Sequence, residues 1–162
     1  SQRYKSHLDA EGFPHDAIDC VLSTGLDSIV DIKEKVVAFS DLKKQPYFEP
    51  LAIAFRRVVS ILKEGADGQV DPLLLHEPAE KKLFEVYLKL HEPVLQHIQK
   101  KEFDQALEKI SEIKPAVDGF FDEVMVMVED VSLRNNRLYL LHQISSLFSG
   151  LADFSRIILK KG

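Results

Sequence analysis

The sequence is poor in the residues and segments that mark disulfide-bonded, secreted or membrane-spanning proteins. Its 162 residues include one cysteine, Cys20, so neither an internal disulfide nor a cysteine-rich metal site can form. No run of about 18 apolar residues occurs, which argues against a transmembrane helix. No basic and then apolar leader indicates a signal peptide. We therefore expect a cytoplasmic protein without membrane contacts, and the helix-like opening "SQRYKSHL" suggests a fragment of a longer chain.

Motifs for common catalytic chemistry are also missing. The sequence contains no G-x-x-x-x-G-K-[ST] phosphate loop, no G-x-S-x-G nucleophile elbow and no H-E-x-x-H zinc motif. The spacing of His76, His91 and His97 does not place three ligands at one point on a helix. His91 lies on an apolar stripe and is expected to be a core residue. We predict no catalytic residue and no metal site, which leaves a metal-dependent hydrolase as the weakest reading.

The charge is unevenly distributed. The net charge of −5 argues against a nucleic-acid-binding surface over the whole molecule, and we expect no DNA partner. Residues 33–63, however, contain seven basic and three acidic residues, a net charge of +4, whereas the remainder carries −9. A split of this size is typical of solvated helix faces, so it does not by itself indicate a binding site.

Hydrophobic residues recur with a helical period along nearly the whole chain, and no convincing alternating strand occurs. Helices are predicted at about 1–11, 16–25, 27–41, 50–64, 83–98, 102–113, 116–127 and 131–160. Pro93 is expected to kink or split the fifth of these. We therefore predict one all-α domain over 1–162, a helical bundle of about eight helices. A turn-rich linker near 65–72 would divide it into two helical halves.

The helix predicted at 50–64 provides the first candidate binding surface. One face carries Leu51, Phe55, Val58, Val59 and Leu62, and the other carries Arg56, Arg57, Ser60 and Lys63. Such a polar face can hold phosphates or hydrogen-bond bases. The alternative is an ordinary solvent-exposed helix side.

The stretch "LKKQPYFEP", residues 42–50, provides a second candidate, because Lys43 and Lys44 adjoin Tyr47. Aromatic rings stack on unpaired bases and ammonium groups meet phosphates, so this combination suits unpaired RNA. The alternative is that Phe48 packs against the start of the next helix while the lysines are solvated.

The last predicted helix carries an arginine among its leucines. Arg137 falls on the stripe formed by Leu133, Leu140 and Ile144. A buried arginine persists only when it is paired, so we predict a structural ion pair, with Asp122 as its partner, that fastens this helix to the preceding one. The acidic pair at 129–130 is expected to cap the same helix.

The C-terminal third closely resembles the β subunit of the heterotetrameric bacterial glycyl-tRNA synthetases. The resemblance rests on Asp118 with Phe120–Asp122 and Val124–Val126, on Arg134, Asn136, Arg137 and Leu138, and on Ala152, Asp153 and Ser155. The stretches "GFPHDAIDCVL" and "FRRVVSILK" are similar to that family as well, so the likeness extends over essentially the whole chain. Ser60 stands where the family helix usually has asparagine, and serine offers fewer donors for reading a base.

The resemblance implies a DALR-like anticodon-binding domain. The family's enzyme joins glycine to its tRNA with ATP and magnesium, and its catalytic site lies largely in the separate α subunit. This fragment would then need no cofactor of its own. Its expected partners are glycine tRNA, the α subunit and the other β-subunit domains of the heterotetramer. The second hypothesis is a helical protein-interaction module without RNA contact.

Overall fold

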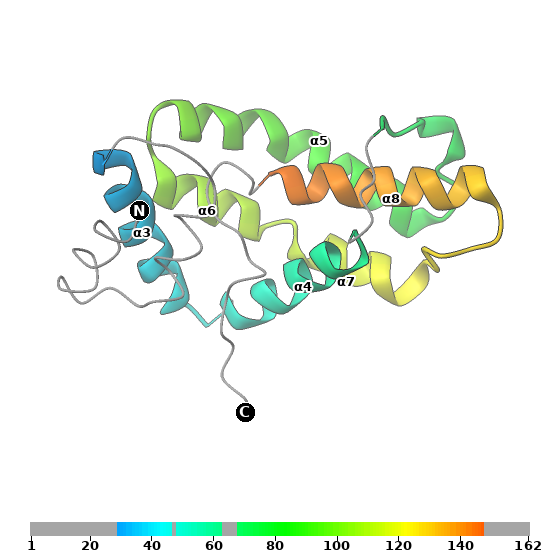
Figure 1. The fold of residues 1–162 in the computed structure, drawn as a ribbon, viewed down its shortest axis with the longest axis horizontal. Coiled ribbons are helices and arrows are strands. Elements are labelled where there is room, and N and C mark those ends of the chain that lie inside the picture. Colours follow the sequence, from blue (N-terminus) through cyan, green and yellow to red (C-terminus); the bar gives the residue numbers. More distant parts are fainter. Residues whose placement is uncertain (1–28, 47, 63–67, 148–162) are drawn as a thin grey trace.

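A computed structural model describes residues 29–46, 48–62 and 68–147. Within these ranges the chain forms six α-helices and one short 3-10 helix, and it contains no β-strand (Figure 1). The predicted all-α class is confirmed. About eight helices were predicted for the whole chain, and the two expected near 1–11 and 16–25 lie outside the described residues.

The first two described helices are α3, Ile29–Lys43, and α4, Phe48–Ile61. A turn at Lys44–Pro46 separates them, as expected, since a proline disfavours helical geometry in the residue before it. Phe48 begins α4 and is buried, as the structural alternative for this stretch required. Leu51, Phe55 and Val58 of the predicted apolar stripe are buried, whereas Val59 and Leu62 are half-buried.

The 3-10 helix η1, Pro72–Leu74, leads into the long helix α5, Pro78–Gln99. A capping box between Glu77 and Glu80 starts α5, because each side chain accepts a hydrogen bond from the other residue's backbone N–H. Pro93 was expected to kink or split this helix; it does not split it, since α5 runs from Pro78 to Gln99 as one helix. Packing along the rest of α5 therefore outweighs the one backbone hydrogen bond that proline removes.

The prediction that His91 is a core residue is wrong, because its side chain is exposed. The buried positions of α5 follow Leu83, Tyr87, Leu90 and Val94, and His91 lies one position beyond that line. The ring of Tyr87 is its neighbour, with 5.4 Å between the ring centroids. His91 therefore contacts the Tyr87 ring at the surface and is not part of the core.

The chain then forms α6, Phe103–Ser111, α7, Lys114–Glu123, and α8, Val131–Ser146. Residues 124–130 between α7 and α8 are not helical. The Asp130 side chain accepts a hydrogen bond from the Leu133 N–H at 3.1 Å, so the predicted cap of the last helix is confirmed.

Helices from both sides of the linker pack against one another. In Figure 1, α8 lies lengthwise between α5 and α4, and α7 lies beside α4, while α3 packs on α6 at the other end of the molecule. One hydrophobic cluster includes Phe55 from α4, Leu83 from α5, Phe120 from α7 and Leu140 from α8. The two predicted halves therefore share a core. No helix in the described ranges has both the length and the apolarity needed to span a bilayer.

Candidate nucleic-acid interface

The outward side of α4 presents the basic residues that the sequence singled out. Arg56, Arg57 and Ser60 are all exposed, while Phe55 and Val58 on the opposite side are buried. Because α4 is anchored in the core through that side, its polar side chains project from a rigid support. Their exposure makes these three side chains accessible to a ligand, while their role in RNA binding stays a prediction.

Arg57 is held against an aromatic ring of a neighbouring helix. Its guanidinium carbon lies 4.4 Å from the centroid of the Phe121 ring on α7. Phe121 in turn meets Phe120 edge-to-face, with the ring planes at 82°, and Phe120 is fully buried. A cation over a ring face is attracted by the ring quadrupole, so Phe121 both orients the guanidinium and restrains it. An arginine restrained in this way is suited to stacking on or hydrogen bonding with a planar ligand.

A groove of about 470 Å³ opens beside this arginine. Arg57 and Ser60 of α4 line it together with Phe121 of α7 and with Met125 and Met127 of the segment after α7. The groove therefore combines a guanidinium and a hydroxyl with apolar side chains. Planar, partly apolar ligands that carry negative charge, such as unstacked nucleotides, need both features.

The methionine side of the groove belongs to the non-helical segment 124–130, which begins in extended conformation at Val124 and bends at Val126 and Met127. Val124 and Val126 are buried, whereas Met125 and Met127 are 72% and 62% exposed. Side chains therefore alternate between the core and the solvent along these four residues. Residues 116–127 were predicted to form one helix, but α7 ends at Glu123, and Met125 and Met127 were not predicted to line a site. The alternation of valine and methionine in "VMVM" is the sequence signal that could have identified them.

Arg137 anchors this segment from behind. Its Nη1 donates a hydrogen bond to the carbonyl oxygen of Met125 at 2.6 Å, and its Nη2 donates to Glu80 Oε1 at 3.0 Å. The Arg137 side chain is 7% exposed and that of Glu80 is 0% exposed. The ion pair exists, but the predicted partner, Asp122, is wrong. Asp122 is exposed near the end of α7, and the carboxylate that faces Arg137 comes from α5, 57 positions away.

Two other residues of the same motif are also structural. Asn136 is buried, accepts the Asp71 N–H at 2.7 Å and donates to the Asp71 carbonyl at 3.1 Å, which fixes the start of η1 to α8. Arg134 donates to the carbonyl of Val128 at 3.3 Å. The later part of the family motif, Arg134, Asn136 and Arg137, thus holds the groove in place, whereas its earlier part supplies lining residues such as Phe121 and Met125.

The remaining predicted contact residues are not brought into the groove within the described ranges. Lys44 is exposed in the turn after α3, and Lys43, in the last turn of α3, is half-buried and engaged with other groups. Tyr47 and Lys63 lie outside the described residues. The contribution of these four to RNA binding therefore stays a prediction.

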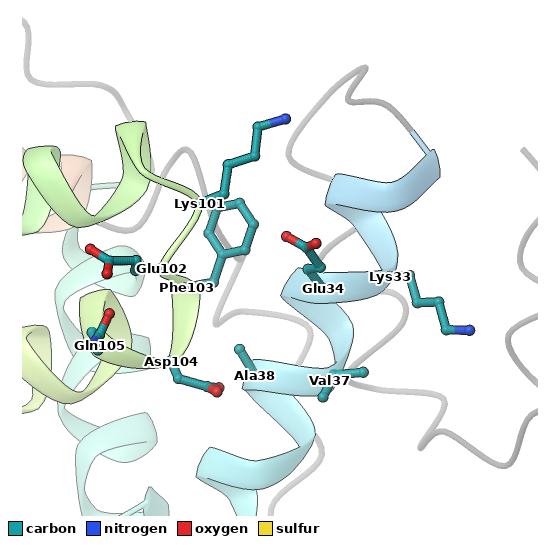
Figure 2. A pocket seen from close by; sticks show the side chains of 9 residues that line it. All are labelled: Lys33, Glu34, Val37, Ala38, Lys101, Glu102, Phe103, Asp104 and Gln105. Carbon is teal, nitrogen blue, oxygen red and sulfur yellow. The ribbon is translucent and has the colours of Figure 1, made fainter.

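A second, larger cavity of about 700 Å³ lies between α3 and the turn from α5 to α6 (Figure 2). Figure 2 shows Glu34 directed towards the Phe103 side, whereas Lys33 points away from it. Charges of both signs line this cavity: Lys33 and Lys101 are opposed by Glu34, Glu102 and Asp104. Burial, and secondarily the charge of Asp41, raise the pKa of Asp104. A lining with this many carboxylates does not suit phosphate, so we assign the nucleic-acid site to the groove on α4.

Among the described residues, no group of three or more histidine, cysteine, aspartate or glutamate side chains is placed to hold a metal ion. The groove itself offers hydrogen bonds from Arg57 and Ser60 and apolar contact with the two methionines.

Comparison with known proteins gives this geometry a context. Residues 51–153 match the family model described as DALR anticodon binding domain, a range that contains every residue of the groove. The chain is 38% identical over 156 residues to the glycine–tRNA ligase beta subunit of Syntrophus aciditrophicus. It is 41% and 40% identical over 151 residues to the beta subunits of Geotalea daltonii and Trichlorobacter lovleyi. These alignments cover 93–96% of the chain but only 22–23% of each relative, so the chain spans less than a quarter of their length.

Proposed function

This chain belongs to the family of DALR anticodon-binding domains, and from that premise we propose that it binds the anticodon region of a glycine tRNA as part of a glycine–tRNA ligase β subunit. The observation that carries the proposal is the groove beside α4, where Arg57, held on Phe121, faces an apolar wall. Unpaired bases are recognised by stacking and by hydrogen bonds to their exposed edges, and this groove offers both.

The proposed contacts follow from the chemistry of each side chain. Glycine anticodons share two cytosines, whose O2 and N3 atoms accept hydrogen bonds. Arg57 can donate to those acceptors while Ser60 bonds either a base edge or a ribose, and Arg56 on the exposed side can meet a phosphate. Serine supplies one hydroxyl donor, in contrast to the amide of asparagine, so we assign the main reading contact to Arg57.

The whole enzyme's chemistry is part of the proposal and lies outside this chain. Glycylation with ATP and magnesium would take place largely in a separate α subunit, within a heterotetramer. The chain would supply tRNA recognition, in the cytoplasm, and no catalytic group. The absence of catalytic motifs from the sequence supports this division of labour.

The test is a titration of the purified chain with glycine tRNA by filter binding at low salt. We expect Arg57→Ala to weaken binding roughly 5- to 150-fold, the range for loss of an arginine contact to a base. We expect Arg56→Ala to lower the slope of log Kd against log salt concentration by about one phosphate contact. Circular dichroism should be unchanged, because both side chains are exposed.

A matched control is Lys100→Ala, which removes an exposed cation at the C-cap of α5. Its affinity should equal that of the unmodified chain. If Arg56→Ala, Arg57→Ala and Lys100→Ala all bind glycine tRNA as well as the unmodified chain, this face of α4 is not the interface.

One observation favours the second candidate function, a protein-interaction module. Leu88 and Leu95, seven positions apart on the same side of α5, are 57% and 39% exposed. Such residues suit contact with another domain of a longer chain. Salt separates the two functions, since RNA binding through several phosphates weakens steeply as salt rises and apolar docking does not.

A further inference from the structure

The two methionines of the chain are adjacent to each other and both lie at the surface. Met125 and Met127 are the only methionines in the sequence, and more than half of each side chain is exposed. Apolar side chains at this exposure are common singly, but here two flank one groove together with Arg57. An exposed apolar patch rimmed by polar groups marks an interaction site.

The segment that carries them is fixed and not a free loop. Arg137 binds the carbonyl of Met125, Arg134 binds the carbonyl of Val128, and the side chains of Val124 and Val126 are buried in the core. The backbone is thereby held at both ends and from beneath. The buried Arg137 thereby holds two flexible apolar side chains at a defined position on the surface.

Thioethers are suited to contact with planar rings. Methionine is unbranched and polarizable, and its sulfur makes favourable contacts with aromatic systems. A ring that enters the groove would meet both the methionines and the guanidinium of Arg57, since all three line it. The Phe121 ring already covers one side of that guanidinium, which leaves it oriented for such a ligand.

We propose that the Met125–Met127 segment is the second wall of the RNA interface, where both thioethers contact an unstacked base of the anticodon loop that Arg57 binds from the side of α4. This inference rests on the proposed function and extends it from one helix to a two-sided site. The cation Arg57 in the groove, with the exposed Arg56 next to it on α4, favours a polyanion as the occupant over an apolar protein segment.

The first test is oxidation footprinting of the full chain. Hydrogen peroxide converts each thioether to a sulfoxide. Every methionine sulfoxide comes from Met125 or Met127, because the chain has no other methionine, and fragmentation in the mass spectrometer distinguishes the two. The affinity for a glycine tRNA transcript is measured beforehand. With the transcript at ten times its Kd, we expect both methionines to be oxidised about tenfold more slowly, in proportion to the free fraction.

The outcomes separate the two proposals. If the transcript binds and the oxidation rates are unchanged, the second wall is refuted while anticodon binding through α4 stands. If no glycine tRNA binds, the proposed function fails and this inference fails with it. If a tRNA with a different anticodon, at the same saturation, slows methionine oxidation equally, the methionines contact RNA outside the anticodon. The assignment to an anticodon base is then wrong.

The second test uses Met125→Ser and Met127→Ser, with Leu88→Ser on α5 as a matched control of similar exposure. We expect each methionine variant to bind the transcript about two- to tenfold more weakly, the range for a sulfur–ring contact, and the control to bind normally. Transcripts with one abasic anticodon position then locate the base. The transcript that lacks the base bound in the groove should bind the methionine variants as tightly as it binds the unmodified chain. If every abasic transcript binds the methionine variants more weakly than the unmodified chain, the proposal is contradicted.

Discussion

The buried pair of Arg137 and Glu80 allows a quantitative stability prediction. In Arg137→Met, an apolar side chain of similar length replaces the guanidinium, and the Glu80 carboxylate, which has no solvent exposure, loses its counter-ion. The variant also loses the hydrogen bond to the Met125 carbonyl. Removing one member of a buried ion pair costs about 3–5 kcal/mol, because the remaining charge stays desolvated.

A second substitution isolates the stranded charge as the cause. Glu80→Gln removes that charge but keeps a side-chain oxygen that can accept the Glu77 N–H in the capping box. The double variant E80Q/R137M should therefore recover at least half of the lost free energy of unfolding. The existing pair is incompletely satisfied, since Glu80 Oε2 and Arg137 Nε have no hydrogen-bond partner in the described structure. Replacing both charges is therefore less costly than removing one.

Urea unfolding at neutral pH, monitored by circular dichroism, measures the free energies of unfolding of the unmodified chain, R137M and E80Q/R137M by linear extrapolation. The glycine tRNA titration adds a readout that stability does not provide. E80Q/R137M still lacks the anchor on Met125, so we expect weaker RNA binding even where stability is restored. The reasoning is refuted if R137M unfolds within about 1 kcal/mol of the unmodified chain, or if the double variant is as unstable as R137M.

Two further predictions concern packing and pH. An alanine Cβ at Gly68 would lie 2.6 Å from the Tyr139 ring, so Gly68→Ala should destabilise the fold by about 1–3 kcal/mol. At Gly119 in α7 a Cβ would meet no atom within 4 Å, so Gly119→Ala should stabilise the fold by about 0.5–1 kcal/mol. Urea unfolding of both variants tests this, and equal effects would contradict it. Burial raises the pKa of Asp104, so its proton is held more tightly in the folded chain and its contribution to stability falls as pH rises from below its ordinary value of 3.8. Asp104→Asn should therefore gain stability relative to the unmodified chain between pH 3 and neutral pH, and parallel curves of unfolding free energy against pH would rule that effect out.

The sequence by itself determined the features that depend on local spacing. A helical period over residues 50–64 is enough to place Phe55 inside and Arg56 outside, because each residue turns the helix by a fixed angle. Asp130 is read as a cap for the same local reason, since its side chain needs only the backbone of the next turn. The C-terminal motif likewise identifies the family, which the match over residues 51–153 confirms.

Only the tertiary structure decided which distant residues meet. Arg137 was predicted from its position to need a carboxylate, but Glu80 on α5 and the Met125 carbonyl bind it because α8 packs against α5 and the 124–130 segment. The Phe121 ring beneath Arg57 depends in the same way on the packing of α7 against α4. Periodicity fixes the inward direction of each helix relative to its own axis, whereas the neighbour met in that direction depends on how all the helices pack together. The groove is therefore a property of the packed bundle, assembled from residues of α4 and of the 121–127 region that lie far apart in the chain.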